Sequence, residues 1–281
     1  MALRPHWQTT RFQIDLTQPR VMGIVNATPD SFSDGGRHAT TAAALWHAER
    51  LVEEGADILD IGGESTRPGA PAVSAQEEWA RIEGVLQGAL QLGVPVSVDT
   101  HKTEVMQRAL DLGVDIVNDI RALSAPRALD VVAAHPSCGV CLMHMQGQSP
   151  ADMQQASQYV DVVAQVSGFL RERMDGAQRA GIALERLTLD PGIGFGKAPE
   201  HNLALMRRQP ELLQLGRPLL LGWSRKSTLG HLTGRPVGER LAASLAAALA
   251  SVQQGAAIVR VHDVAATVDA IRVWRAAGLS N

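Results

Sequence analysis

The chain has 281 residues, with 26 basic and 29 acidic side chains and a formal net charge of −3. This near-neutral balance excludes nucleic acid as the main partner, because neutralising a phosphate backbone requires clustered Lys and Arg. The sequence has no run of about 18 apolar residues, so we expect no membrane span. Two cysteines are too few for a disulfide framework, and residues 1–13 lack the apolar segment of a signal peptide. We therefore expect a cytoplasmic globular protein.

Short apolar runs rich in Val, Ile and Leu recur along the chain, and each ends in polar or glycine residues. Such runs are typical of strands buried on both faces. We expect eight strands, at residues 21–25, 56–61, 94–98, 114–117, 139–143, 187–189, 218–221 and 257–261. We expect eight helices after them, at residues 40–54, 74–92, 102–112, 126–134, 156–180, 199–213, 238–254 and 264–276.

Local sequence features predict where several of these helices begin and end. Ser74 followed three residues later by Glu77 is a capping-box pattern. A glycine follows most of the helices, which predicts left-handed stops at Gly55, Gly93, Gly113, Gly181, Gly255 and Gly278.

The alternation of eight strands with eight helices predicts an α/β fold, a single-domain (β/α)8 TIM barrel. We assign residues 1–281 to this one domain, with residues 1–19 as a short N-terminal extension in which residues 12–16 form a strand below the barrel. A doubly wound open sheet also alternates strands and helices. The count of eight favours the barrel, and so does the polar group that ends nearly every strand, because a barrel gathers those ends at one mouth.

Polar side chains at these strand ends predict a ligand site. Asp99 and Asp190 accept hydrogen bonds when ionised, and Asn118 both donates and accepts. Together they suit a flat heterocycle with a guanidine-like edge. The alternative is that such residues only cap the helices that follow.

Two further segments predict an anion site. Residues 224–228 place Arg225, Lys226 and hydroxyl groups at a strand-to-helix turn. The twofold period of a strand puts Arg260 and His262 on one side and Val261 on the other. A solvated basic turn is the alternative interpretation.

The loops after the first two strands are rich in Gly, Pro, Ser and Asp. Residues 28–36 carry Phe32, and residues 62–70 carry Thr66 and Arg67. Their length and their position at the barrel mouth favour loops that close over a substrate, although ordinary surface loops have a similar composition.

Two motifs suggest chemistry that we do not expect here. Residues 192–197 resemble a phosphate-binding loop, but Ala198 follows Lys197 where a Ser or Thr is required. Four residues spaced three apart suggest zinc: His135, Cys138, Cys141 and His144. Residues 139–143 are a predicted strand, however, in which a spacing of three points to opposite faces. We expect the two cysteines to be small core residues.

The strand ends and loops carry five specific motifs, which together resemble the dihydropteroate synthase family. They are MGIVNATPDSFSDGG at 22–36, DIGGESTRPG at 60–69, DPGIGFGK at 190–197, GWSRKS at 222–227 and RVHD at 260–263. The resemblance covers nearly the whole chain from Val21 onward. It implies a (β/α)8 barrel, usually as a homodimer, that joins (7,8-dihydropterin-6-yl)methyl diphosphate to 4-aminobenzoate and releases pyrophosphate, with Mg²⁺ as the cofactor.

The resemblance also implies roles for individual residues. The pterin would be held by Asp99, Asn118, Asp190, Lys226 and Arg260. The diphosphate would be held by Asn26, Thr66, Arg67, Arg260 and His262, with Asn26 as a Mg²⁺ ligand. The aminobenzoate, and sulfonamides in its place, would contact Phe32, Thr66, Pro68, Phe195 and Ser227. The residues expected to be catalytic are Asp99, Lys226 and Arg260.

Two other functions are compatible with a pterin pocket. A methyltransferase module that passes a methyl group to a corrinoid needs the pterin pocket but no diphosphate site, so Arg260, His262 and the Ser224 turn argue against it. A catalytically silent paralogue would be expected to lack a loop or a strand-end polar residue, and none is missing. One small departure from the family is Thr103, where many relatives have proline, and it concerns helix stability only.

Overall fold

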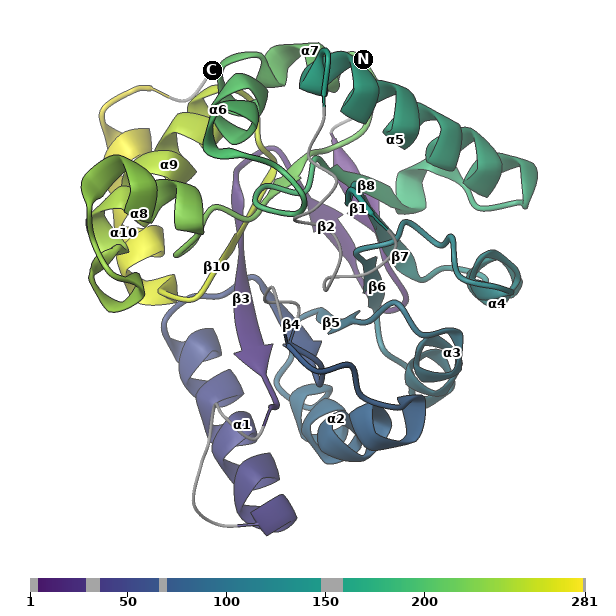
Figure 1. Ribbon diagram of the computed structural model, residues 1–281. Helices are drawn as coiled ribbons and strands as arrows, with labels where there is room; N and C mark the ends of the chain where they lie inside the picture. Colours follow the sequence, from purple (N-terminus) through teal and green to yellow (C-terminus); the bar gives the residue numbers. More distant parts are fainter. Residues whose placement is uncertain (1–4, 29–35, 66–69, 148–158, 280–281) are drawn as a thin grey trace.

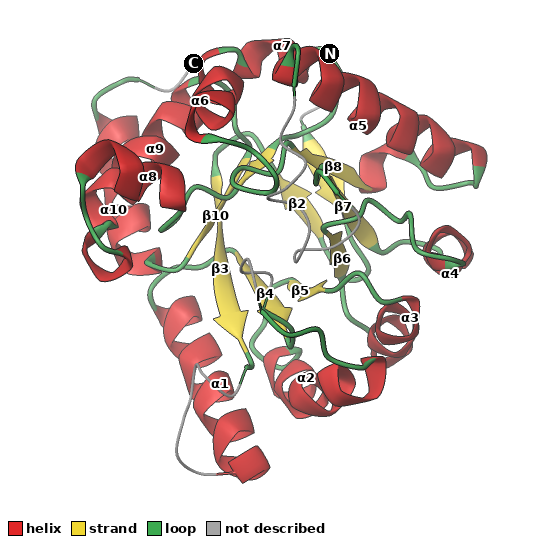
Figure 2. Cartoon of the chain, viewed as in Figure 1, coloured by secondary structure: helices red, strands yellow, loops and turns green. Residues whose placement is uncertain are grey.

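The protein is described here from a computed structural model, which covers residues 5–28, 36–65, 70–147 and 159–279. Eight parallel strands form a ring and the helices lie outside it, as Figures 1 and 2 show. The strands are β3 (Arg20–Asn26), β4 (Ile58–Gly62), β5 (Val96–Asp99), β6 (Ile116–Asp119), β7 (Gly139–Met143), β8 (Leu187–Asp190), β9 (Leu220–Leu221) and β10 (Ile258–Val261). The predicted (β/α)8 barrel is confirmed.

The ring closes between β8 and β9. The strand order is β8-β7-β6-β5-β4-β3-β10-β9, all in parallel pairs. Leu189 pairs with Leu219 across the remaining gap, and the Leu189 N–H donates to the Pro218 carbonyl at 3.0 Å. An open doubly wound sheet is thereby ruled out, so the carboxyl ends of all eight strands meet at one mouth.

Helices pack around the ring and largely follow the predicted positions. They are α1 (Gly36–Glu53), α2 (Ala75–Ala89), α3 (Thr103–Leu112), α4 (Ala128–Ala134), α5 (Val162–Arg179), α6 (Pro199–Arg207), α7 (Gln209–Leu213), α8 (Ser227–Thr233), α9 (Leu241–Gln253) and α10 (Val264–Ala276). The Ser74 hydroxyl accepts from the Glu77 N–H at 3.1 Å, as its pattern predicted. The six predicted glycine stops all have φ between +71° and +98°.

Three helical predictions need correction. The single helix expected at 199–213 breaks at Arg208 (φ −107°), because Pro210 has no N–H to bond to the Met206 carbonyl and its ring disturbs the preceding helical turn. The helix expected at 238–254 is a 3₁₀ turn (Val237–Glu239) followed by α9. The short helix α8 had no counterpart in the prediction. The first residues of the helix expected at 156–180 lie outside the described residues, and α5 begins at Val162.

An antiparallel hairpin lies below the barrel where a single strand was expected at 12–16. It consists of β1 (His6–Gln8) and β2 (Gln13–Asp15), with Trp7 opposite Ile14. Trp7, Ile14 and Leu16 pack against inward-facing side chains at the amino ends of the strands: Met22, Ile58, Ile116, Cys141, Leu220 and Ile258. The hairpin therefore seals the lower end of the barrel with apolar side chains, while polar groups occupy the upper end.

A larger apolar core fills the layer between the ring and the helices. Alternate strand residues point outward into it, for example Val25, Leu59 and Val261. The two cysteines lie on opposite sides of the ring of strands. Cys138 belongs to the core between the ring and the helices, and Cys141 belongs to the core inside the barrel. Both are free and buried, and the described residues contain no His, Cys, Asp or Glu group that could hold a metal ion.

Candidate active site

A cavity of about 840 Å³ opens at the carboxyl ends of the strands. Each predicted site residue in the described part of the chain lines it: Asn26, Asp99, Asn118, Asp190, Phe195, Lys226, Ser227, Arg260 and His262. They come from seven different segments, and barrel closure brings them together. The predicted residues Phe32, Thr66, Arg67 and Pro68 lie outside the described residues.

Arg260 is the centre of the charged groups in this cavity. Its Nε donates to Asp60 Oδ2 at 2.5 Å, and its Nη2 donates to Asp99 Oδ2 at 2.6 Å. Asn118 Nδ2 donates to the same Asp60 oxygen at 3.1 Å. One guanidinium thus joins β10, β4 and β5, with β6 held through Asn118. The arrangement fixes the planar fork of Arg260 across the floor of the cavity.

Asp60 is a site residue that the sequence prediction missed. Its side chain is fully buried, and among the described residues its Oδ1 has no hydrogen-bond partner. The sequence did carry a signal for Asp60, because a carboxylate within the apolar run Ile58–Gly62 is unusual and must have partners when buried. The twofold period of the strand places it on the inward face with Ile58. Asp60 falls in mid-strand, however, whereas the polar residues that predicted the site lie at strand ends.

Burial raises the pKa values of two carboxylates in the cavity, which favours their protonated forms. It raises the pKa of Asp99 to about 7, although Arg260 opposes the shift. It also raises the pKa of Asp190 to about 6, against the hydrogen bond that Asp190 Oδ1 accepts from the Gly192 N–H at 2.7 Å. A ligand edge that offers N–H donors stabilises the ionised forms of both groups.

The capping alternative holds for some of the strand-end residues. Asp119 accepts from the N–H groups of Arg121 and Leu123 at 2.8 and 2.7 Å, which fixes the turn after β6. Asp190 does the same with one oxygen only. Among the described residues, Asp99 instead accepts from Arg260, so its carboxylate serves the cavity.

Lys226 is a second cation that lines the cavity with Arg260. Burial lowers its pKa to about 8, and Arg260 reinforces this effect. Its ammonium lies over the Phe195 ring, 4.1 Å from the centroid, a favourable cation–π geometry. Of its neighbours, Arg225 pairs at the rim with Asp263 at 2.6 Å, and Thr228 accepts from Asn202 at 2.9 Å. The predicted basic turn therefore directs Lys226 into the cavity.

His262 is held in one orientation by Ser224. The Ser224 hydroxyl accepts from the His262 N–H at 3.2 Å and lies 3.0 Å from Nδ1. The serine hydroxyl can donate its proton to Nδ1, and in that tautomer Nε2–H is a donor. Burial lowers the pKa of His262 to about 3, so the ring is neutral. A neutral donor beside cationic side chains suits a diphosphate oxygen.

Asn26 ends β3 at the rim, half-buried, and no described residue hydrogen-bonds to its side chain. Its carbonyl oxygen is a donor atom of the kind that Mg²⁺ prefers, and Mg²⁺ commonly takes one or two protein oxygens with substrate phosphates. The residues present thus fit a Mg²⁺ ion that arrives with a diphosphate.

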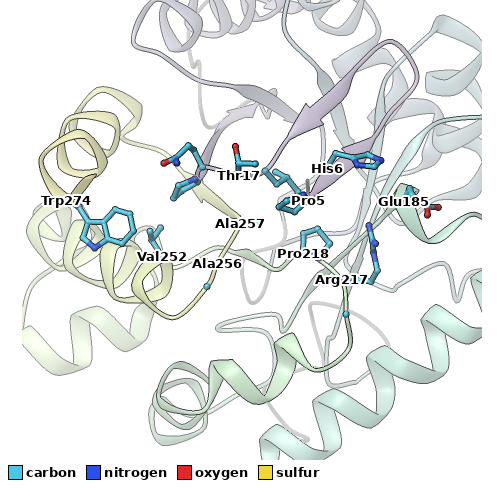
Figure 3. Close-up of a pocket in the computed structure, with 15 residues that line it drawn as sticks. Pro5, His6, Thr17, Glu185, Arg217, Pro218, Val252, Ala256, Ala257 and Trp274 are labelled. Carbon is cyan, nitrogen blue, oxygen red and sulfur yellow. The ribbon is translucent and has the colours of Figure 1, made fainter. Parts of the chain in front are cut away.

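A second cavity, of about 530 Å³, lies at the opposite end of the barrel (Figure 3). Pro5, Leu16, Pro218 and Trp274 contribute to its lining. None of the predicted site residues lines it, so the polar groups discussed above all belong to the mouth.

Comparisons with known proteins identify the family of this chain. A family model described as pterin binding enzyme matches residues 22–262. The dihydropteroate synthase of Neisseria meningitidis serogroup B is 55% identical over 280 residues, which covers 98% of each chain. The chain belongs to the dihydropteroate synthase family.

Two solved structures extend the comparison to ligands. Dihydropteroate synthase of Xanthomonas albilineans with 4-aminobenzoic acid superposes with a TM-score of 0.92 at 51% identity, covering 98% of this chain and 99% of that one. The same enzyme in complex with 7,8-dihydropteroate gives a TM-score of 0.89 at 48% identity, covering 98% of this chain and 99% of that one.

None of the helices in the described part of this chain combines the length and the apolar character that a membrane span requires.

Proposed function

We propose that this chain condenses (7,8-dihydropterin-6-yl)methyl diphosphate with 4-aminobenzoate to give 7,8-dihydropteroate and pyrophosphate. The observation that carries the proposal is the meeting of Asp99, Asn118, Asp190, Lys226 and Arg260 in one cavity. Relatives at about half identity over nearly the full length bear this name, and solved relatives hold 4-aminobenzoate or dihydropteroate. A transferase of this kind belongs to folate biosynthesis.

Pterin recognition follows from the donor and acceptor pattern of the floor. Asp190 and Asn118 would pair with the amino and ring N–H groups of the pterin, which match a carboxylate and an amide. Lys226 would donate to the pterin carbonyl or ring nitrogen. Arg260, fixed by Asp60, would lie flat against the ring, since a guanidinium stacks well on an aromatic face.

The reaction breaks the bond between the pterin methylene carbon and the diphosphate oxygen and forms a bond from that carbon to the aminobenzoate nitrogen, which then loses one proton. Positive charge develops on the pterin methylene as the diphosphate leaves. Asp99 would stabilise that charge electrostatically, with no covalent intermediate on the protein. Ser224 does pair with His262 in the cavity, but burial lowers the pKa of His262 to about 3, so the imidazole is a weak base, and the proposed reaction needs no nucleophile from the protein.

The leaving diphosphate would be held by Arg260, the Nε2–H of His262 and, from the loop outside the described residues, Thr66 and Arg67. Asn26 would ligate a Mg²⁺ ion, which when bound neutralises charge on the leaving group. Phe195 and Ser227, with Phe32, Thr66 and Pro68, would form the aminobenzoate subsite. A corrinoid methyltransferase module is disfavoured, because the Ser224–His262 pair serves a diphosphate site that it does not need.

We further propose a cytoplasmic homodimer. Three large apolar side chains are exposed on α8, the following 3₁₀ turn and α9: Leu232 at 54%, Val237 at 55% and Leu241 at 43%. Side chains of this kind gathered on neighbouring elements are typical of an interface between subunits. Sedimentation of the purified protein tests this part of the proposal.

The decisive experiment mixes the purified protein with the dihydropterin diphosphate, Mg²⁺ and 4-aminobenzoate and follows both products, omitting each component in turn. We expect dihydropteroate and pyrophosphate in equal amounts, dependent on Mg²⁺ and on aminobenzoate. Pterin binding without product would identify a silent paralogue, and absence of binding would reject the pocket itself.

A further inference from the structure

A buried lysine outside the predicted site occupies the loop after β8. Lys197 is only 7% exposed, yet its Nζ has four acceptors within hydrogen-bond distance. They are the carbonyls of Gly192 at 2.9 Å, Phe195 at 3.0 Å and His144 at 3.2 Å, together with His144 Nδ1 at 2.9 Å. An ammonium has three donors, so all of them are engaged inside the protein.

The loop 192–196 is folded around this ammonium. Its three glycines all have positive φ, at +70°, +81° and +65°, and in this conformation the Gly192 and Phe195 carbonyls both face the ammonium. The close approach has no room for a side chain at Gly192, where a Cβ would lie 1.9 Å from the His144 carbonyl oxygen. The middle of the loop is held by Asn202, whose Oδ1 accepts from the Gly194 N–H at 2.9 Å.

His144 must be neutral to accept at Nδ1, and its surroundings keep it so. Burial, together with the charge of Lys197, lowers the pKa of His144 to about 3. Phe169 packs edge-on against the imidazole with centroids 4.9 Å apart, which holds the ring in place. The lysine therefore joins β7, through His144, to the loop after β8.

The other side of this loop forms part of the active-site cavity. Ile193, Gly194 and Phe195 line it. Phe195 packs with Ile120, Met143 and Met145 and lies under the ammonium of Lys226. Lys197 itself does not line the cavity, but its bond to the Phe195 carbonyl fixes the backbone that carries the ring.

We infer that Lys197 is a positioning residue, which holds Phe195 in place through the loop 192–196 and so sets the affinity for 4-aminobenzoate. The inference rests on the proposed function, in which Phe195 contacts the aminobenzoate. Lys197 touches neither substrate. Of the groups proposed to hold the pterin, Asp99, Asn118 and Arg260 lie on β5, β6 and β10, away from this loop, whereas Asp190 and Lys226 contact it through Gly192 and Phe195. Pterin binding should therefore be affected much less than aminobenzoate binding.

The test replaces Lys197 by methionine, which keeps the length and removes the ammonium. We expect the KM for 4-aminobenzoate to rise about 10-fold or more, since small displacements of a positioned group cost up to about 100-fold. The kcat at saturating aminobenzoate and the calorimetric Kd of the dihydropterin diphosphate should change by less than about 3-fold, within the usual uncertainty of context effects. Lys197→Gln, which keeps two donors, should give an intermediate KM and provides a second variant if Lys197→Met does not fold.

Two controls separate positioning from general destabilisation. Arg186 is also a buried cation, 4% exposed, and donates to the Cys138 and Val132 carbonyls at the opposite end of the barrel. Arg186→Met should lower the melting temperature and leave the aminobenzoate KM unchanged. In a Phe195→Ala background, Lys197→Met should raise that KM no further, because both changes act through one ring.

The outcomes distinguish this inference from the proposed function. A wild-type protein that forms no dihydropteroate overturns both. An active wild-type protein whose Lys197→Met variant keeps its aminobenzoate KM overturns the inference alone. The inference alone is also overturned if Lys197→Met raises the aminobenzoate KM by the same factor in the Phe195→Ala background as in the wild type. It is likewise overturned if Arg186→Met raises that KM equally.

Discussion

Asp60 and Arg260 are 200 positions apart in the sequence, yet the Arg260 Nε donates to Asp60 Oδ2 at 2.5 Å. The pair crosses from β4 to β10 over the intervening strand β3. Asp60 is fully buried and Arg260 lines the cavity, so the carboxylate acts through the guanidinium. Desolvation disfavours the cation, but Asp60 and Asp99 outweigh it and raise the pKa of Arg260. The charge of Arg260 is therefore permanent.

The first prediction concerns Asp60. Asp60→Asn keeps the shape and removes the charge that orients Arg260, so we expect kcat/KM for the pterin substrate to fall by on the order of 100-fold. Asp57→Asn is the matched control, because Asp57 pairs with Arg20 at 3.0 Å at the amino end of the barrel. Steady-state kinetics check this, and equal losses in both variants would assign Asp60 a merely structural role.

The second prediction concerns the stability of the free protein against pH. Burial raises the pKa of Asp190 to about 6, above about 3.9 for an unfolded aspartate. The folded state binds the proton more tightly, so this contribution is fully present below about pH 4 and is lost as the pH rises through about 6, at up to about 1.4 kcal/mol per pH unit. Asp190→Asn removes it. In thermal melts, the stability of the variant relative to the wild type should increase between about pH 4 and 6. If stability depends on pH in the same way in both proteins, the assignment to Asp190 is wrong.

Pterin binding should have the opposite pH dependence, which gives a third prediction. The ionised forms of Asp190 and Asp99 accept from the donor edge of the pterin, and burial places their pKa values at about 6 and about 7. Binding measured by calorimetry should therefore tighten as the pH rises through this window. The dependence should weaken in Asp99→Asn. An unchanged pH profile in that variant would remove Asp99 from the pterin site.

The fourth prediction concerns the proposed metal. Chelation of Mg²⁺ should abolish turnover, and added Mg²⁺ should restore it. Asn26→Ala should raise the Mg²⁺ concentration required for half-maximal activity by about 10-fold or more, as changes around metal sites commonly do. Gln209→Ala, a change to a buried amide that donates to the Ser251 and Gln254 carbonyls away from the cavity, is the comparison. If Asn26→Ala shows wild-type Mg²⁺ dependence, another group must hold the ion.

The fifth prediction separates stability from catalysis. Trp7 is fully buried in the hairpin below the barrel, and its indole N–H donates to the Arg186 carbonyl at 2.8 Å. Trp7→Ala should destabilise the fold by about 3–5 kcal/mol, the usual cost of a large core truncation. Because the cavity lies at the other end of the strands, kcat at a temperature where the variant is folded should be close to the wild-type value. Denaturant unfolding and kinetics on one preparation measure both, and a large fall in kcat would show that the two ends are coupled.

Local rules explain how well the regular elements were predicted. Apolar runs gave all eight strands, since a strand covered on both faces needs continuous apolar residues. The six glycine stops and the Ser74 cap were predicted because a left-handed residue or a side-chain cap depends only on neighbours in the chain. The break at Arg208 was missed although Pro210 indicated it. The pairing of β1 with β2 was missed because strands of three residues leave little periodic pattern.

The sequence by itself determined the barrel, its polar mouth and the family resemblance, because strand periodicity and strand-end residues are local properties. Only the tertiary structure decided which carboxylate orients Arg260 and what Lys197 does. Asp60 and Arg260 meet by ring closure across 200 positions, and the Lys197 ammonium finds acceptors from His144 at the end of β7. A buried charge must take its partners from whichever strands the fold places beside it, and no local pattern specifies that choice.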